Sequence, residues 1–171
     1  MRFNIAYPAW CAALVIAGCS GSGVERVNAT AHPDASAPVG SVAHDRGVFT
    51  ELLQKHTRIR REFREIDGGI ESLTESDDPR VAALIVEHVQ AMKKRVETGA
   101  RIRQWDPLYV AVFDAGERIR LEIERTGKGV RVRETSSDPE VVKLIRQHAG
   151  VVSGFVSLGS EESAKEHPVE R

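Results

Sequence analysis

TESDDPRVAALIVEHV (residues 74–89) is followed sixty residues later by ETSSDPEVVKLIRQHA (residues 134–149), so the chain carries the same pattern twice. The similarity extends outward from these stretches. Residues 48–99 align with residues 108–159 without a gap, and 14 of the 52 positions are identical. The identical residues gather at turns, helix caps and apolar positions, which is typical of the duplication of one folding unit.

Each repeat has the pattern of a helix, a β-hairpin and a second helix. The opening helices are expected at residues 47–57 and from Asp106 onward, and the second helices from Asp78-Pro79 and Asp138-Pro139, where aspartate caps and proline fits the first turn. Between them, strand-like alternation surrounds glycine-bearing turns at residues 67–69 and 127–129.

These patterns predict an α+β fold. Two tandem helix-hairpin-helix repeats, 47–99 and 107–159, would form one four-stranded antiparallel sheet with a pseudo-two-fold axis between them. One face of each predicted hairpin is heavily charged. We therefore expect helices to cover only the other face of the sheet.

The beginning of the chain has the features of a targeting segment. Residues 9–17 form an apolar run too short to span a bilayer, and they lead into Ile16-Ala17-Gly18-Cys19. This motif resembles the lipobox of bacterial lipoproteins. The resemblance implies cleavage before Cys19, attachment of lipid, including palmitate, to that residue, and, because Ser20 follows, delivery to the periplasmic face of the outer membrane. An ordinary cleaved signal peptide is the alternative.

The expected organisation is a signal peptide (1–18), a lipidated cysteine and flexible tether (19–46), one duplicated domain (47–160) and a polar C-terminal tail (161–171). The chain has 24 basic and 25 acidic residues. Without a basic excess, nucleic acid is not an expected partner, whereas the membrane is, through the lipid. Cleavage and acylation would leave no free thiol, so His, Met, Ser, Asp or Glu would have to supply any reactive or metal-binding group.

His88 and His148 occupy the same position on the apolar face of the two repeated helices. Neutral imidazole is the commonest metal ligand in proteins, and Met92 lies one helical turn beyond His88. His56 is a candidate third histidine ligand. This His/Met set without thiolate predicts copper or haem iron as the bound group. The alternative is that both histidines are structural and hydrogen-bond to strand carbonyls or helix caps.

The two repeats differ at positions that are predicted to face inward. Arg61 and Ser72 stand in the first repeat where Leu121 and Val132 stand in the second, and His56 stands where the second has Gly116. Such replacements predict a polar ligand pocket in the first half, lined by His56, Arg61, Ser72 and His88. In this pocket Arg61 would pair with a carboxylate, a phosphate or a haem propionate. Alternatively, Arg61 lies at the margin of the sheet and reaches water.

Taken together, the chain is predicted to be a membrane-anchored extracytoplasmic binding module that holds a metal ion or haem-like ligand between its halves without catalysis. An envelope protein–protein interaction module with structural histidines is the alternative, and a periplasmic enzyme using a His/Arg site is a weaker third. No GxSxG, HExxH or phosphate-binding glycine loop is present. The two "DP…LI..H" helices and the central "WDP" resemble a type of uncharacterised extracytoplasmic bacterial protein over residues 47–160, which implies no activity.

Overall fold

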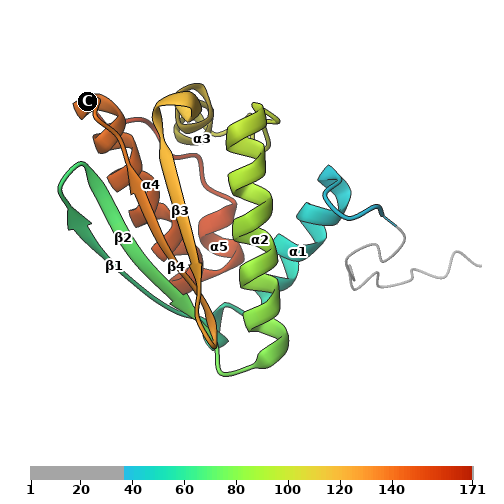
Figure 1. Cartoon of the computed structure of the whole chain (residues 1–171). Helices are drawn as coiled ribbons and strands as arrows, with labels where there is room; N and C mark the ends of the chain where they lie inside the picture. The colour runs from blue at the N-terminus through green and yellow to red at the C-terminus, as the bar shows by residue number, and fades with distance from the viewer. Residues whose placement is uncertain (1–36, 171) are drawn as a thin grey trace, which may run out of the picture.

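The computed structural model describes residues 37–170 and confirms an α+β fold with one four-stranded antiparallel sheet (Figure 1). The predicted signal peptide, the predicted lipidation site Cys19 and most of the predicted tether lie outside the described residues. The described elements, in chain order, are α1 (Val42–Gln54), η1 (His56–Arg58), β1 (Arg60–Ile66), β2 (Gly69–Glu75), α2 (Pro79–Thr98), α3 (Pro107–Asp114), η2 (Gly116–Arg118), β3 (Arg120–Arg125), β4 (Gly129–Thr135), α4 (Pro139–Leu158) and α5 (Ser160–Ser163).

The sheet has the strand order β1-β2-β4-β3, so each hairpin contributes one central strand and one edge strand. The central strands β2 and β4 are antiparallel, and their register pairs Ser72 with Val132 at its middle. They approach closely at both ends. A Cβ atom on Gly69 would lie 1.8 Å from the Glu134 carbonyl oxygen, and one on Gly129 would lie 2.1 Å from that of Thr74. This close approach explains why glycine begins both strands.

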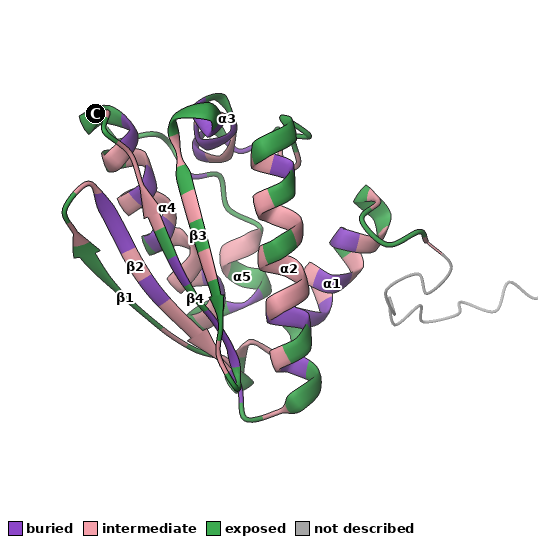
Figure 2. Cartoon of the chain, viewed as in Figure 1, coloured by how far each residue is buried: buried purple, intermediate pink, exposed green. Residues whose placement is uncertain are grey.

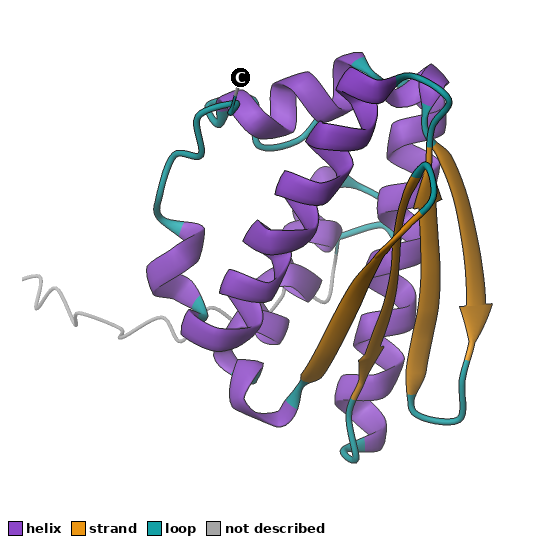
Figure 3. Ribbon diagram, turned by 90° about the vertical axis from the view of Figure 1, so that its left-hand side faces the viewer, coloured by secondary structure: helices purple, strands orange, loops and turns teal. Residues whose placement is uncertain are grey.

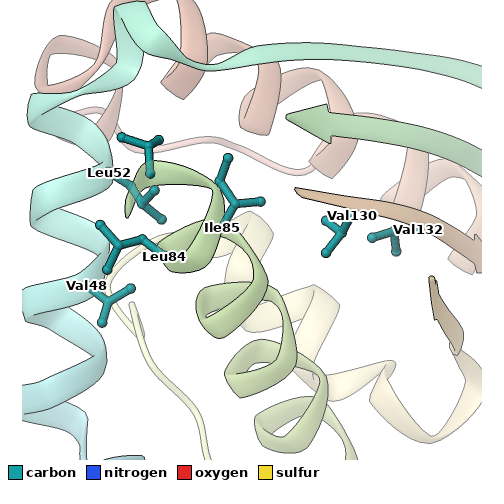
Figure 4. Close-up of a cluster of buried hydrophobic side chains, with 7 residues drawn as sticks. Val48, Leu52, Leu84, Ile85, Val130 and Val132 are labelled. Carbon is teal, nitrogen blue, oxygen red and sulfur yellow. The ribbon is translucent and has the colours of Figure 1, made fainter. Parts of the chain in front are cut away.

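Helices gather on one side of the sheet, as the charge pattern predicts (Figure 3). Ile70, Val130 and Val132 alternate with polar neighbours and are buried beneath the helices. Buried segments recur along the central strands β2 and β4 (Figure 2). Two apolar clusters fill this layer, and Figure 4 draws the first of them. One consists of Val48, Leu52, Val81, Leu84, Ile85, Val130 and Val132, and the other of Ile70, Ala115, Val141, Ile145 and Ala149.

The opposite face of the sheet is open and carries cross-strand rows of opposite charges. One row runs through all four strands, and the register places its members side by side in the order Arg64, Glu71, Arg133, Glu122. The Arg64 Nη2 atom lies 2.8 Å from the Glu71 Oε1 atom. Charged side chains on neighbouring strands are therefore paired across the solvated face of the sheet.

The predicted helix caps are present. The Asp78 side chain accepts hydrogen bonds from the backbone of Arg80 and Val81, and the Asp138 side chain accepts one from Glu140. Pro79 and Pro139 stand in the first turns of α2 and α4. These residues fix where both long helices begin.

The folded domain includes residues on both sides of the predicted range 47–160. The helix α1 begins at Val42, where the Ser41 side chain caps it by accepting a hydrogen bond from the His44 backbone N–H. Asp45 in its first turn is buried against Arg95, whose Nε atom donates to the Asp45 Oδ2 atom over 2.7 Å. At the other end, the chain turns through α5 and brings His167 back to α3. None of the described helices combines the length and apolar character needed to cross a membrane.

Candidate ligand cavity

Two adjoining cavities lie between the covered face of the sheet and the helices. Their volumes are about 160 Å³ and about 120 Å³. Five residues line both of them: Arg61, Thr74, His88, Val89 and Val152. Most of the remaining lining is aliphatic or aromatic, so the few polar groups determine what these cavities can bind.

Arg61 points from β1 into the space shared by both cavities. Its Nη1 atom donates to the Thr74 Oγ1 atom over 2.8 Å, and its Nε atom is buried without a hydrogen-bond partner. Among residues 37–170, no carboxylate lies within ion-pair distance of its guanidinium. Burial lowers the pKa of Arg61, while the negative charge of Glu134 partly opposes that shift. The guanidinium is therefore enclosed rather than extended into water at the margin of the sheet.

The two histidines on the long helices also line the larger cavity. Enclosure of the His88 ring lowers its pKa to about 4, and the neighbouring His148 adds to that shift. The Nδ1 atoms of both rings are buried without a hydrogen-bond partner. The His148 Nδ1 atom lies 3.8 Å from the Glu134 Oε2 atom. His88 is thus neutral at pH 7 and keeps an unused ring nitrogen.

Aromatic side chains hold these rings. Phe49 stacks on His88 with ring centres 5.5 Å apart, and Tyr109 meets His148 edge-on at 5.3 Å. Phe155 lies between the two pairs, 5.6 Å from Phe49 and 6.3 Å from Tyr109. Burial raises the pKa of the Tyr109 hydroxyl, which is therefore neutral at physiological pH. The aromatic rings fix both imidazoles at the cavity wall.

The structure brings most of the predicted site residues together. Arg61, Ser72, His88, Met92 and His148 all line the larger cavity. His56 lines only the smaller one, and its Nδ1 atom hydrogen-bonds to the Val156 carbonyl oxygen at 2.9 Å. Five of these six predicted residues therefore line one cavity, and His56 lies in the adjoining one.

Sequence reasoning missed Thr74, Tyr109 and Glu134. Thr74 and Glu134 are the first residues of the two repeated stretches, and Tyr109 stands sixty residues after Phe49. The comparison of inward positions that singled out Arg61 would also have found Glu134. It would have shown an acid facing the cavity in the second half where the first half has a hydroxyl.

The arrangement fits a metal ion poorly. Within residues 37–170, no group of three or more His, Cys, Asp or Glu side chains is placed to hold one. His88, His148 and Met92 offer two imidazole nitrogens and a thioether, but the Arg61 guanidinium shares their cavity and opposes a second positive charge. The prediction of copper or haem stays a prediction that this geometry does not favour.

Comparison with known proteins gives no relative from which to assign this cavity: no protein-family model, no curated protein and no solved structure matches the chain. The resemblances drawn from the lipobox and from the repeated helices stay predictions.

Proposed function

We propose that this chain is a non-catalytic binding module that holds a small organic anion in the cavity between its sheet and its helices. The observation that carries the proposal is the Arg61 guanidinium, enclosed in an apolar cavity without a carboxylate partner among the described residues. A buried charge left without a partner is costly, because its hydration is lost and nothing replaces it. An anionic group on a ligand would provide the missing partner.

The chemistry around Arg61 favours a carboxylate. A guanidinium offers parallel N–H donors that match the two oxygens of a carboxylate. The two unpartnered imidazole nitrogens at the wall could exchange further hydrogen bonds with an oxygen-bearing ligand. The negative charge of Glu134 opposes the binding of an anion and limits the total negative charge that the cavity tolerates. A monoanion is therefore preferred.

The size of the cavities limits the ligand. An engineered protein cavity of about 150 Å³ accommodates benzene, and the larger cavity here has a volume of about 160 Å³. Pockets for drug-sized ligands usually occupy about 300–1,000 Å³. The proposed ligand is therefore a compact molecule with a group about the size of one ring, and a haem-like macrocycle is too large for either cavity.

We further propose that the two halves arose by duplication and are related by a pseudo-two-fold axis through the middle of the β2–β4 pair. Ser72 and Val132 face each other there and are sixty residues apart in sequence. The aromatic pair Tyr109–His148 likewise lies sixty residues after the aromatic pair Phe49–His88. The shared cavity lies close to this axis, so one ligand would contact both halves.

The place of action is also a proposal. The lipobox-like Ile16–Cys19 motif supports attachment to a bacterial membrane through lipid on Cys19, with the domain on the extracytoplasmic side. In that setting the module would bind its ligand in the periplasm. Labelling with a fatty acid, compared between the wild type and Cys19→Ala, tests this attachment directly.

The binding proposal is tested with benzoate, inorganic phosphate and benzyl alcohol, added to the full-length protein and to the Arg61→Leu variant. Leucine is the residue at the corresponding position of the second half, Leu121, so the variant should fold. Benzoate should stabilise the wild type, by about 2.7 kcal/mol at a hundred times its Kd. Benzyl alcohol, which has the ring without the charge, should bind much more weakly.

Two results would overturn the proposal. Equal stabilisation of the wild type and Arg61→Leu by benzoate would show that the guanidinium is not the anchor. Stoichiometric binding of copper or haem that is lost in His88→Ala/His148→Ala, without any response to the anions, would establish a metal or haem protein instead. Calorimetry and visible absorption distinguish these cases.

A further inference from the structure

The strand β1 is an unpaired edge of the sheet. It pairs with β2 along its inner side, and no other described strand pairs with it. Phe63, in the middle of β1, is 38 % exposed although it points to the covered side of the sheet. A seven-residue edge with an exposed aromatic side chain is a surface to which another strand can add.

The sequence of this edge, Arg-Arg-Glu-Phe-Arg-Glu-Ile, is complementary to itself in antiparallel orientation. When two copies are centred on Phe63, Glu62 of each copy faces Arg64 of the other, and the two phenylalanines face each other. Glu62 and Arg64 both point to the open face of the sheet, so the pairing keeps both covered faces on the same side. Opposite charges placed directly across a strand pair stabilise it.

We propose that β1 is a self-association surface, and that its partner is the β1 strand of a second copy of this chain, paired antiparallel about Phe63. The two sheets would then form one continuous sheet of eight strands. The contacts that carry this inference are separate from the ligand cavity, because Glu62, Phe63 and Arg64 are not among the residues that line it. The same register sets Arg61, at the cavity wall, against Glu65 of the second copy.

The charges of the open face support this register. The row Arg64, Glu71, Arg133, Glu122 alternates in sign, and its member on the edge strand β1 is the positively charged Arg64. Glu62 of a second copy would lie next to Arg64 and continue the alternation across the interface. Within residues 37–170, the Glu62 carboxylate forms no ion pair of its own, so it is available for this contact.

Other registers and the other edge lack this complementarity. Centring the pair on Glu62 would set Arg60 against Arg64, and centring it on Arg64 would set Phe63 against Glu65. At the opposite edge, a symmetric pairing of β3 centred on Glu122 would set two glutamates against each other, and one centred on Ile123 would set Glu122 against Glu124. The self-complementary sequence is therefore specific to β1.

The test uses the full-length chain with Cys11→Ser and Cys19→Ser, so that neither lipid nor a disulfide can link copies. Sedimentation velocity should show a concentration-dependent dimer. Glu62→Arg and Arg64→Glu should each weaken the dimer by about tenfold or more, because each turns two attractive pairs into like-charge pairs. Glu122→Arg, the corresponding change on β3, should leave the dimer intact.

A mixture of the two weakened variants gives the decisive result. Glu62→Arg carries two arginines beside Phe63, and Arg64→Glu carries two glutamates there. In a mixed pair each of these arginines would face a glutamate, so an equimolar mixture should dimerise while each variant alone stays monomeric. Circular dichroism checks that both are folded. A monomeric wild type, retention of the dimer in Glu62→Arg, or the absence of a mixed dimer would each overturn the proposal.

Discussion

Arg61 and Leu121 show how one side chain can favour ligand binding while it lowers the stability of the ligand-free fold. Both occur at the same place in their hairpins, but only Arg61 brings a charge into the cavity. Without ligand, that charge lacks a partner among the described carboxylates. Replacing it with leucine should therefore raise the free energy of unfolding by about 1–3 kcal/mol while abolishing anion binding.

Chemical denaturation of the wild type and Arg61→Leu in ligand-free buffer measures this effect. The reverse change, Leu121→Arg, is the matched control, since it adds a second charge to the same cavity and should destabilise the fold. A less stable Arg61→Leu would indicate that the guanidinium already has a stabilising role without ligand.

His88 makes the stability of the protein dependent on pH. Its pKa is about 4 in the folded chain, below the ordinary value of 6.5. Between these values, the unfolded chain binds a proton that the folded chain excludes. Acidification from pH 6.5 to pH 4 should therefore cost about 3 kcal/mol through this residue, and the loss should be absent above pH 6.5.

The variant His88→Phe isolates that contribution, because it keeps an aromatic ring against Phe49 and cannot titrate. The difference in unfolding free energy between wild type and variant should change over pH 4–6.5 and stay constant at higher pH. A constant difference over the whole range would mean that the His88 ring takes up its proton at the same pH in the folded and the unfolded chain.

At the scale of elements, the beginning of α3 depends on the end of the domain. Asp106 is fully buried and accepts hydrogen bonds from the backbone of Leu108 and from the His167 backbone and ring. Asp106→Ala should lower the free energy of unfolding by about 3 kcal/mol, since it breaks a buried network as well as a cap. Hydrogen exchange should also show residues 160–170 released from α3.

Asp138→Ala provides the comparison for that variant. Asp138 caps α4 from a more exposed position, where it contacts Arg118 but not the C-terminal segment. Its loss should destabilise the protein less and leave residues 160–170 protected. If both variants had the same effect, the contact with His167 would contribute nothing beyond the cap.

Much of this element-level structure was predictable, because its causes are local. The hairpins, the proline-flanked aspartate caps and the charged sheet face each follow from residues within a few positions of one another. The Asp45–Arg95 pair and the Asp106–His167 contact join residues 50 and 61 positions apart. No local pattern marks such pairs. Periodicity therefore did not predict that residues before 47 and after 160 pack against the domain.

At the scale of the whole molecule, the gathering of the site residues was partly predictable. Alternation along the strands placed Arg61 and Ser72 inward, and helical periodicity did the same for His88 and His148. Whether these side chains share one cavity depends on how the two hairpins pair, which periodicity does not determine. The enclosure of Arg61, on which the proposed function depends, became visible only in three dimensions.

The central pairing of β2 with β4 also determines the order in which the fold can form as the chain emerges from a ribosome or a translocation channel. When the first hairpin is out, β2 has no neighbour on one side until residue 135 has followed. The cap of α3 is completed only when residue 167 arrives. An isolated hairpin is marginal in water, and an open strand invites wrong partners. The first half must therefore be kept from premature association while it waits for the second.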